Sequence, residues 1–319
     1  MILKAIRRTV LLLIYVYVSC SLLLFHGPFT ALRGYVIDIF TTSMHGYLLR
    51  PLSMYTLSQA EINKHLPQLM NTGGLTNAQI TQQNFNNINS SSIKIVNYKT
   101  STFSAQVMMI RDPQRLQVAV TKYAGNVGQT VSQLVSEYHG VAGVNGGAFK
   151  DTKNWRGTGG IPLGITISNG KVIQADPAQQ PVIALTKKGA LIAGSYTLTQ
   201  LKSLGVQEAL SFGPVLVQNG RDMIQGTGGW GYAPRTAIGQ TANGTILLVV
   251  TDGRFIHGPN NLGASLQDMA QLMLHYGAQV AANLDGGSST TMVYNGKLVN
   301  EPSDVLGERE VATALVVMP

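Results

Sequence analysis

The sequence near its C-terminus contains a motif in which a carboxylate precedes two glycines and a hydroxyl group. Asp285 follows an apolar stretch and is followed directly by Gly286, Gly287 and Ser288. Glycine adopts backbone conformations that are closed to other residues and lets a ligand approach the main chain. An acid on such a turn is expected to lie beside exposed N–H donors that suit an anion. The motif therefore predicts a functional site at the end of a strand.

A motif of the same form occurs earlier in the chain, with an amide in place of the acid. Asn145 precedes Gly146 and Gly147 there. Upstream of each motif, the spacing of apolar residues predicts a helix, capped by Thr130 in the first case and by Ser265 in the second, and then a short strand. Two such strand ends predict one shared site. An ordinary turn without chemistry is the alternative, because Asn and Gly are common in turns.

Three arginines beside turns or strand ends are candidate ligands for a phosphodiester, namely Arg235, Arg254 and Arg309. A planar guanidinium group matches two oxygens of a phosphate better than a lysine ammonium group does. A surface or structural ion pair is the alternative for each of them.

The sequence contains no recognisable metal or cofactor motif. Its histidines lack the spacing of metal ligands, and it has no HExxH helix, Walker loop or GxSxG elbow. Asp252, Asp285 and Asp304 would hold a divalent cation only if the fold gathered them, and their spacing matches no known ion loop. We therefore assign no cofactor and no metal ligand.

Four Asn-Gly pairs between apolar or β-branched runs indicate tight hairpins. They lie at residues 169–170, 219–220, 243–244 and 295–296. The flanking runs predict strands, including residues 164–167, 215–217, 246–250 and 313–317. The predicted fold class is α+β, with a largely antiparallel or mixed β-sheet, few helices and the repeated order of helix, strand and Gly-Gly turn.

The N-terminus predicts a membrane anchor. Lys4, Arg7 and Arg8 precede an almost uninterrupted apolar run, and we assign residues 9–25 to the membrane. No small-x-small cleavage site follows closely, which favours a retained anchor over a cleaved signal peptide. Basic residues before the segment predict that the N-terminus stays in the cytoplasm and that the rest of the chain lies outside it.

Composition limits the partners of the exported part. The net charge is +8, and without the three basic residues of the anchor 20 bases face 15 acids, which leaves +5. This excess suits an anionic envelope polymer, but no basic stripe of the kind that binds nucleic acid is present. Cys20 is the only cysteine, so the exported part must fold without a disulfide. Acylation of Cys20 is disfavoured because Tyr17 stands where a small aliphatic residue is usual.

The chain divides into three predicted regions. Residues 1–29 form the cytoplasmic stub and the anchor. Residues 30–93 form a juxtamembrane segment, with a short helix after Ser58, and then a polar tether without charges from 66 to 93. Residues 94–319 are long enough for one folded domain.

Seven motifs in this domain, taken in order, resemble those of the phosphodiester glycosidase family. They are residues 145–149 (NGGAF), 162–164 (PLG), 213–216 (GPVL), 235–239 (RTAIG), 252–254 (DGR), 283–290 (NLDGGSST) and 302–304 (PSD). Ser288 stands where the family commonly has a third glycine. The resemblance implies hydrolysis of a sugar 1-phosphodiester, such as N-acetylglucosamine 1-phosphate linked to another sugar or to an envelope polymer. Bacterial members of this kind are anchored envelope proteins associated with exopolysaccharide.

The resemblance also implies roles for individual residues. Asp285 is the candidate nucleophile, base or charge stabiliser, and Asp252 or Glu310 is the candidate for a second acid or base. Residues expected to bind the substrate or its phosphate are Asn145, Gly146, Gly147, Arg235, Thr236, Arg309, Gly286, Gly287 and Ser288. The expected partner is a sugar phosphodiester or an anionic envelope polysaccharide.

Two functions without hydrolysis compete with this hypothesis. The first is an anchored module that binds an anionic surface polysaccharide. The second is an assembly factor for exopolysaccharide export, for which residues 30–93 would matter more than the site. The presence of Asp252, Asp285 and Glu310 favours an enzyme, because a binding module would need the arginines without these acids.

Overall fold

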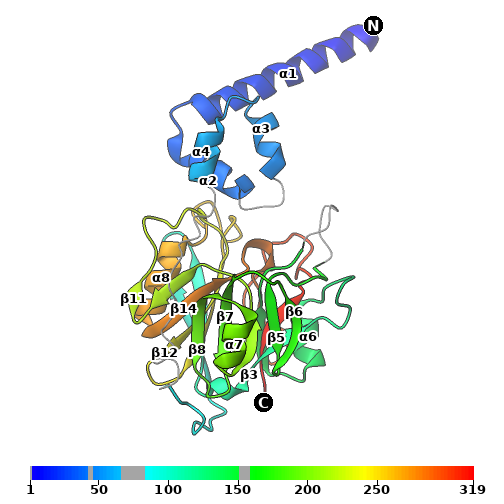
Figure 1. Cartoon of the computed structure of the whole chain (residues 1–319). Coiled ribbons are helices and arrows are strands. Elements are labelled where there is room, and N and C mark those ends of the chain that lie inside the picture. Colours follow the sequence, from blue (N-terminus) through cyan, green and yellow to red (C-terminus); the bar gives the residue numbers. More distant parts are fainter. Residues whose placement is uncertain (1, 42–45, 66–82, 151–158) are drawn as a thin grey trace. The chain divides into compact units, whose positions relative to one another are not determined.

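The computed structural model describes residues 2–41, 46–65, 83–150 and 159–319. It divides into two compact units, which are described separately (Figure 1). The N-terminal unit comprises residues 1–68 together with 228–232, and the main unit comprises residues 69–227 and 233–319.

The N-terminal unit is helical. Its elements are α1 (Ile2–His26), α2 (Thr30–Thr41), η1 (Gly46–Leu48), α3 (Leu49–Leu52) and α4 (Gln59–Lys64). A small core of Phe25, Ile37, Leu49, Leu57 and Ile62 joins them. The predicted helix after Ser58 is confirmed as α4, whose first turn is capped by the Ser58 hydroxyl group, which accepts a hydrogen bond from the Glu61 N–H at 3.1 Å.

Helix α1 has the length and composition of a membrane-spanning helix. Residues Leu3–His26 have a mean hydropathy of 2.1, and most of their side chains are exposed. Such a surface is unfavourable in water and favourable in the apolar interior of a bilayer. A signal sequence near the N-terminus has the same properties.

The main unit contains three β-sheets. The seven-stranded sheet has the order β1 (Ile93–Lys99), β2 (Ser104–Ile110), β13 (Ile246–Thr251), β12 (Thr236–Thr241), β14 (Ala278–Leu284), β10 (Val215–Gln218) and β11 (Arg221–Asp222). One five-stranded sheet has the order β16 (Lys297–Leu298), β15 (Met292–Tyr294), β4 (Ala142–Asn145), β17 (Thr313–Val317) and β3 (Leu116–Val120). The other has the order β6 (Lys171–Ala175), β5 (Ile165–Ser168), β9 (Val206–Leu210), β7 (Gln180–Thr186) and β8 (Leu191–Tyr196).

The strands of the main unit enclose one large apolar core. Buried side chains reach it from all three sheets, for example Ile110 from β2, Val144 from β4 and Leu210 from β9. Every pairing between the strands named above is antiparallel. The predicted α+β class with largely antiparallel sheets is therefore confirmed.

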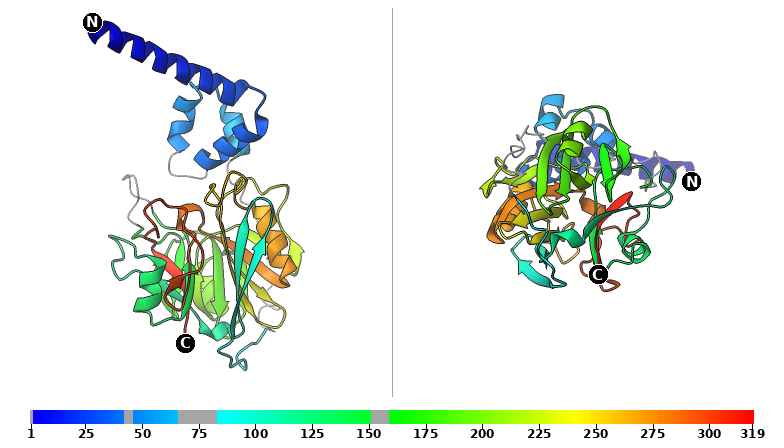
Figure 2. Two further views of the ribbon diagram at one scale, coloured as in Figure 1. Left: turned by 180° about the vertical axis from the view of Figure 1, so that it is seen from behind. Right: turned by 60° about the horizontal axis from the view of Figure 1, so that its bottom comes forward.

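Among the described residues, the main unit also contains the α-helices α6 (Val131–Glu137), α7 (Leu198–Ser203) and α8 (Leu266–His275) and the short 3-10 helices η2 (Pro113–Arg115) and η3 (Gly287–Ser289). Helix α6 packs against β4 and β17, and α8 packs against β10 and β14 (Figures 1 and 2). Thr130 and Ser265 form capping boxes at the starts of α6 and α8. The predicted repeat is confirmed as α6, β4 and a Gly-Gly turn, followed later by α8, β14 and a second Gly-Gly turn.

The four predicted hairpins are also confirmed, because each Asn-Gly pair joins two paired antiparallel strands. At three of them the Asn and the Gly both have positive φ, as at Asn169 (48°) and Gly170 (73°). Positive φ at both central residues is the geometry that matches the twist of the flanking strands.

The described part of the predicted tether lies against the main unit. The Phe85 N–H group donates to the Lys188 carbonyl oxygen at 2.8 Å, and Gln114 Nε2 donates to Asn86 Oδ1 at 2.8 Å. Strand β1 begins at Ile93, one residue before the predicted domain boundary. Residues 66–82 of the predicted tether lie outside the described residues.

Candidate active site

The ends of β4 and β14 meet, although the two strands belong to different sheets. Asn145, the last residue of β4, donates from Nδ2 to the carbonyl oxygen of Asp285 at 2.6 Å. The Asp285 N–H group donates to the Gly146 carbonyl oxygen at 3.2 Å. The prediction that the two motifs lie together is therefore confirmed. These two bonds hold the backbone of Asp285 where β14 ends.

The Asn145 side chain is fully buried and satisfied by protein groups. Its Oδ1 accepts from Thr236 Oγ1 at 2.8 Å and from the Thr291 N–H group at 3.2 Å. Thr236, at the start of β12, is fully buried as well. Asn145 and Thr236 thus act on the position of Asp285, and the contacts of the Asn145 amide are to protein rather than to a free surface.

The N–H groups of both glycine pairs donate within the protein. Gly146 and Gly147 donate to the carbonyl oxygen and Oγ1 of Thr313, at 2.9 and 3.1 Å. Gly286 donates to Asp285 Oδ1 at 2.9 Å, and Gly287 donates to the Pro234 carbonyl oxygen at 2.8 Å. The expectation of exposed N–H donors for an anion is wrong at these four positions, because protein groups already accept the hydrogen bonds: the neighbouring Asp285 for Gly286, and partners distant in sequence for the other three.

The glycines instead serve close packing and the orientation of the acid. A Cβ atom at Gly146 would lie 2.5 Å from Thr313 Oγ1, which is too close for any larger residue. The bond from Gly286 fixes one oxygen of the half-buried Asp285 carboxylate. The turn thereby presents a single, oriented carboxylate at the end of β14.

Two arginines from separate segments converge on residues 287–288. Arg309 Nη1 donates to Ser288 Oγ at 3.3 Å, and its guanidinium carbon lies 5.0 Å from the ring centroid of Phe149. Arg254 lies against Gly287, since a Cβ atom there would be 2.7 Å from Arg254 Nη2. Two cationic groups therefore flank the turn that carries Asp285, which is the arrangement expected for an anionic ligand.

Arg235, the third predicted arginine, is buried. Arg235 is 4% exposed, and its Nε donates to the Ala264 carbonyl oxygen at 3.1 Å. Its backbone lies beside Gly286, where an added Cβ atom would be 3.6 Å from the Arg235 Cα atom. The Arg235 backbone therefore adjoins the turn, and its buried side chain bonds the segment at residue 264.

Asp252 anchors the loop that carries Arg254. Its carboxylate is 3% exposed, and Oδ1 accepts from the Ser104 N–H group at 2.6 Å and from Asn261 Nδ2 at 2.9 Å. Its Oδ2 lies 3.2 Å from Nε2 of the half-exposed His257. The structure thus gives Asp252 a positioning role for this loop. The spacing of His257 in the sequence does not indicate this contact, which is identified only by the fold.

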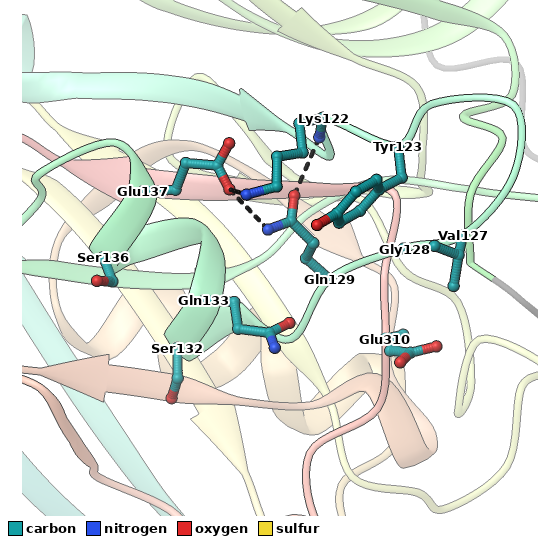
Figure 3. Close-up of a pocket in the computed structure, with 10 residues that line it drawn as sticks. All are labelled: Lys122, Tyr123, Val127, Gly128, Gln129, Ser132, Gln133, Ser136, Glu137 and Glu310. Carbon is teal, nitrogen blue, oxygen red and sulfur yellow. Dashed lines mark hydrogen bonds and ion pairs between the residues drawn. The ribbon is translucent and has the colours of Figure 1, made fainter.

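The structure places Glu310 with a different set of residues. Glu310 lines a cavity of about 620 Å³ together with Lys122, Gln129 and Glu137 (Figure 3). Its neighbour Arg309 contacts Ser288 instead. Because Arg309 and Glu310 lie with different sets of residues, the placement of Glu310 gives no support to its predicted role beside Asp285. Among the described residues, no three His, Cys, Asp or Glu side chains are grouped to hold a metal ion.

Comparison with known proteins gives one family. The family model described as phosphodiester glycosidase matches residues 138–318. N-acetylglucosamine-1-phosphodiester alpha-N-acetylglucosaminidase of Bos taurus is 30% identical over 181 residues, which is 50% of this chain and 32% of the bovine protein. The SPbeta prophage-derived uncharacterized protein YomE of Bacillus subtilis (strain 168) is 33% identical over 121 residues, or 37% of this chain and 18% of that protein. The chain thus spans about a third or less of the length of these relatives.

The fold has a solved counterpart. The catalytic domain of zebrafish N-acetylglucosamine-1-phosphodiester alpha-N-acetylglucosaminidase superposes with a TM-score of 0.60 at 24% identity. The superposition covers 73% of this chain and 85% of the zebrafish domain.

Proposed function

This chain belongs to the phosphodiester glycosidase family, and from that premise we propose that it hydrolyses a sugar 1-phosphodiester. The observation that carries the proposal is the turn at residues 285–288, where one oriented carboxylate lies beside two arginines from other segments. In the reaction, water adds to the anomeric carbon and the bond from that carbon to the phosphate oxygen breaks. The products are the free sugar and a phosphate monoester on the acceptor.

The charges of the turn suit this bond cleavage. Loss of the phosphate leaves positive charge on the sugar ring and adds negative charge to the leaving group. Asp285 is proposed to act at the anomeric carbon, where a carboxylate stabilises the positive charge or forms a bond to it. Arg309 and Arg254 are proposed to bind the phosphate, and Arg235 adds to the positive potential.

Asp252 is proposed as a positioning residue in this reaction. Its hydrogen bonds tie residues 104, 252 and 261 together, and Arg254 lies within the same loop. Removal of its carboxylate would release the loop and let Arg254 leave the phosphate. The effect on turnover would then pass through Arg254 rather than through proton transfer by Asp252.

The proposed setting is the outer face of a cell membrane, with an envelope polysaccharide or a sugar phosphodiester as substrate. Lys4, Arg7 and Arg8 lie at the start of α1, before its apolar stretch. Basic residues on that side favour retention of the N-terminus in the cytoplasm. The main unit would then meet extracytoplasmic substrates while α1 holds the protein at the membrane.

The test is release of free sugar from a panel of sugar 1-phosphodiesters by the full chain in detergent. We expect Asp285→Asn to lower the rate by about 100-fold or more while the chain stays folded. Asp112→Asn is the matched control, because it removes the same charge at a turn where Asn can still accept the hydrogen bond from Gln114. If none of the three proteins releases free sugar but all of them bind an anionic polysaccharide, the result would support the binding module instead.

A further inference from the structure

A concave site lies next to the segment that carries Arg309, apart from the Asp285 turn. It is the cavity of about 620 Å³ lined by Glu310, by α6 and by the loop from Lys122 to Gln129 (Figure 3). Arg309 contacts Ser288, whereas Glu310 lines this cavity. The two sites therefore share one backbone segment and use different side chains.

The cavity has a fixed polar wall. Gln129 is 5% exposed, donates from Nε2 to Glu137 Oε2 at 2.7 Å, and accepts at Oε1 from the Lys122 N–H group at 3.0 Å. Lys122 Nζ lies 3.2 Å from the same Glu137 oxygen. This buried amide fixes the wall of the cavity, and the exposed side chains of Gln133 and Ser136 remain for contacts with a ligand.

An aromatic ring stands at the rim of this wall. Tyr123 is 48% exposed, and Lys122 Nζ lies 5.2 Å from its ring centroid. Figure 3 shows Tyr123 next to Gln129, with Gln133 and Ser136 projecting from α6. An exposed aromatic face offers apolar contact to the C–H face of a sugar ring, and the surrounding amide and hydroxyl groups can bond its hydroxyl groups.

The charges of the cavity select among saccharides. A hydrogen bond to Glu137 raises the pKa of Lys122, and hydrogen bonds from Gln129 and then Lys122 lower the pKa of Glu137, so both are charged and compensate one another at neutral pH. Glu310 adds a carboxylate, and no arginine stands among the described residues of the lining. A phosphate or a uronate would be repelled here, unlike at the turn flanked by Arg254 and Arg309.

We propose that this cavity, the Tyr123 site, is a second and non-catalytic binding site for a neutral or amine-bearing sugar residue. The ring stacks on Tyr123, its hydroxyl groups bond Gln133 and Ser136, and an amino group pairs with Glu310. The site lets the protein hold a saccharide independently of the bond that it cleaves. The proposal goes beyond the proposed hydrolysis and does not depend on it.

Ligand-observed NMR on the full chain in detergent tests the site, with N-acetylglucosamine, glucosamine and glucuronic acid as probes. We expect the first two to bind and glucuronic acid not to bind. Tyr123→Ala should weaken both by about fivefold or more, and Tyr123→Phe should retain them because the ring remains. Glu310→Gln should weaken glucosamine more than N-acetylglucosamine.

Two controls separate this site from the active site and from general surface effects. Asp285→Asn should bind both sugars as the parent does, whether or not the parent hydrolyses phosphodiesters. Tyr55→Ala removes a comparably exposed tyrosine elsewhere, at 72% exposure, and should change nothing. The proposal is overturned if neither sugar binds, if Tyr123→Ala binds them as well as the parent does, or if binding is lost in Asp285→Asn.

Discussion

The Asn145 amide is the side chain that holds the two strand ends together, and its chemistry cannot be replaced by an acid. Nδ2 donates to a carbonyl oxygen, and Oδ1 accepts two hydrogen bonds in a fully buried position. An aspartate at this position would keep the oxygen that accepts two hydrogen bonds. Its second oxygen would replace Nδ2 and would have no proton to donate to the Asp285 carbonyl oxygen. We expect Asn145→Asp to lower the free energy of unfolding by at least about 3 kcal/mol.

Chemical denaturation followed by circular dichroism measures this loss. The matched control is Asn219→Asp, at an exposed turn position with a φ of 51° that Asp also tolerates. It should change stability by less than about 0.5 kcal/mol. Equal, small changes in both variants would show that the Asn145 hydrogen bonds do not hold the strand ends.

Gly287 tests the assignment of Arg254 to the phosphate. Its φ is 61°, and an added Cβ atom would lie 2.7 Å from Arg254 Nη2. Gly296 has a similar φ of 72°, with nothing within 4 Å of an added Cβ atom. Alanine at either position should therefore cost about 1 kcal/mol through backbone strain, but only Gly287→Ala should displace the guanidinium group.

Steady-state hydrolysis of a sugar 1-phosphodiester separates the two effects. We expect Gly287→Ala to raise KM by about tenfold or more, since one bond to a charged group is worth roughly 1.5–3 kcal/mol. Gly296→Ala should leave KM unchanged despite the same loss of stability. Identical kinetics in the two variants would remove Arg254 from the phosphate site.

At the scale of elements, the parts that local chemistry determines could be predicted from the sequence. Each Asn-Gly pair supplies its own positive φ, and each helix before a Gly-Gly turn carries its own capping residue, so the hairpins and the repeat followed from short segments. The contact between the ends of β4 and β14 could be predicted because both strands follow a capped helix and end in a Gly-Gly turn.

The parts that depend on distant partners could not be predicted. Thr313 and Pro234 accept the glycine hydrogen bonds that were expected to serve a ligand. The separation of Arg309 from Glu310 depends on which of the two side chains reaches Ser288. The burial of Asp252 against Ser104 depends on the pairing of β13 with β2. None of these contacts can be predicted from a short stretch of neighbouring residues, because each depends on a residue far away in the sequence.

Glu208 on β9 links two sheets and makes the stability of the fold depend on pH. Its carboxylate accepts from the Val118 N–H group on β3 at 2.8 Å and from the Asn169 N–H group at the β5–β6 turn at 2.9 Å. Burial raises its pKa from 4.5 to about 7, against the lowering effect of these two bonds. The folded chain therefore binds more protons than the unfolded chain between these two pH values.

The contribution of Glu208 to stability is greatest below pH 4.5 and is lost as the pH rises to about 7. The free energy of unfolding should fall across this range by up to roughly 3 kcal/mol. Glu208→Gln carries no titrating proton, so the parent curve minus the variant curve isolates the effect of Glu208. Denaturation curves measured between pH 4.5 and 8 check this, and a flat difference curve contradicts it.

At the scale of the whole molecule, the exposed apolar surface of α1 provides a test of the proposed membrane anchor. Leu13 lies near the middle of the helix and is 64% exposed, whereas Leu3 lies at its start and is 81% exposed. An aspartate at the centre of a membrane-spanning helix costs roughly 2.5–3.5 kcal/mol, and the cost falls toward the headgroups. Leu13→Asp should therefore weaken membrane insertion far more than Leu3→Asp.

Fractionation of expressing bacterial cells measures this difference, with carbonate washing to remove loosely bound protein. We expect the parent and Leu3→Asp to stay in the membrane pellet and a clearly larger share of Leu13→Asp to appear in the wash. Protease added outside intact spheroplasts should cleave the main unit of the parent, because the basic residues before α1 favour export of everything after it. Protection of the main unit would place it in the cytoplasm, and an equal release of both variants would mean that α1 does not span the bilayer. The first result would remove envelope polymers as the natural substrate, the second would remove the membrane anchor, and both would leave the chemistry of the Asp285 turn to be tested separately.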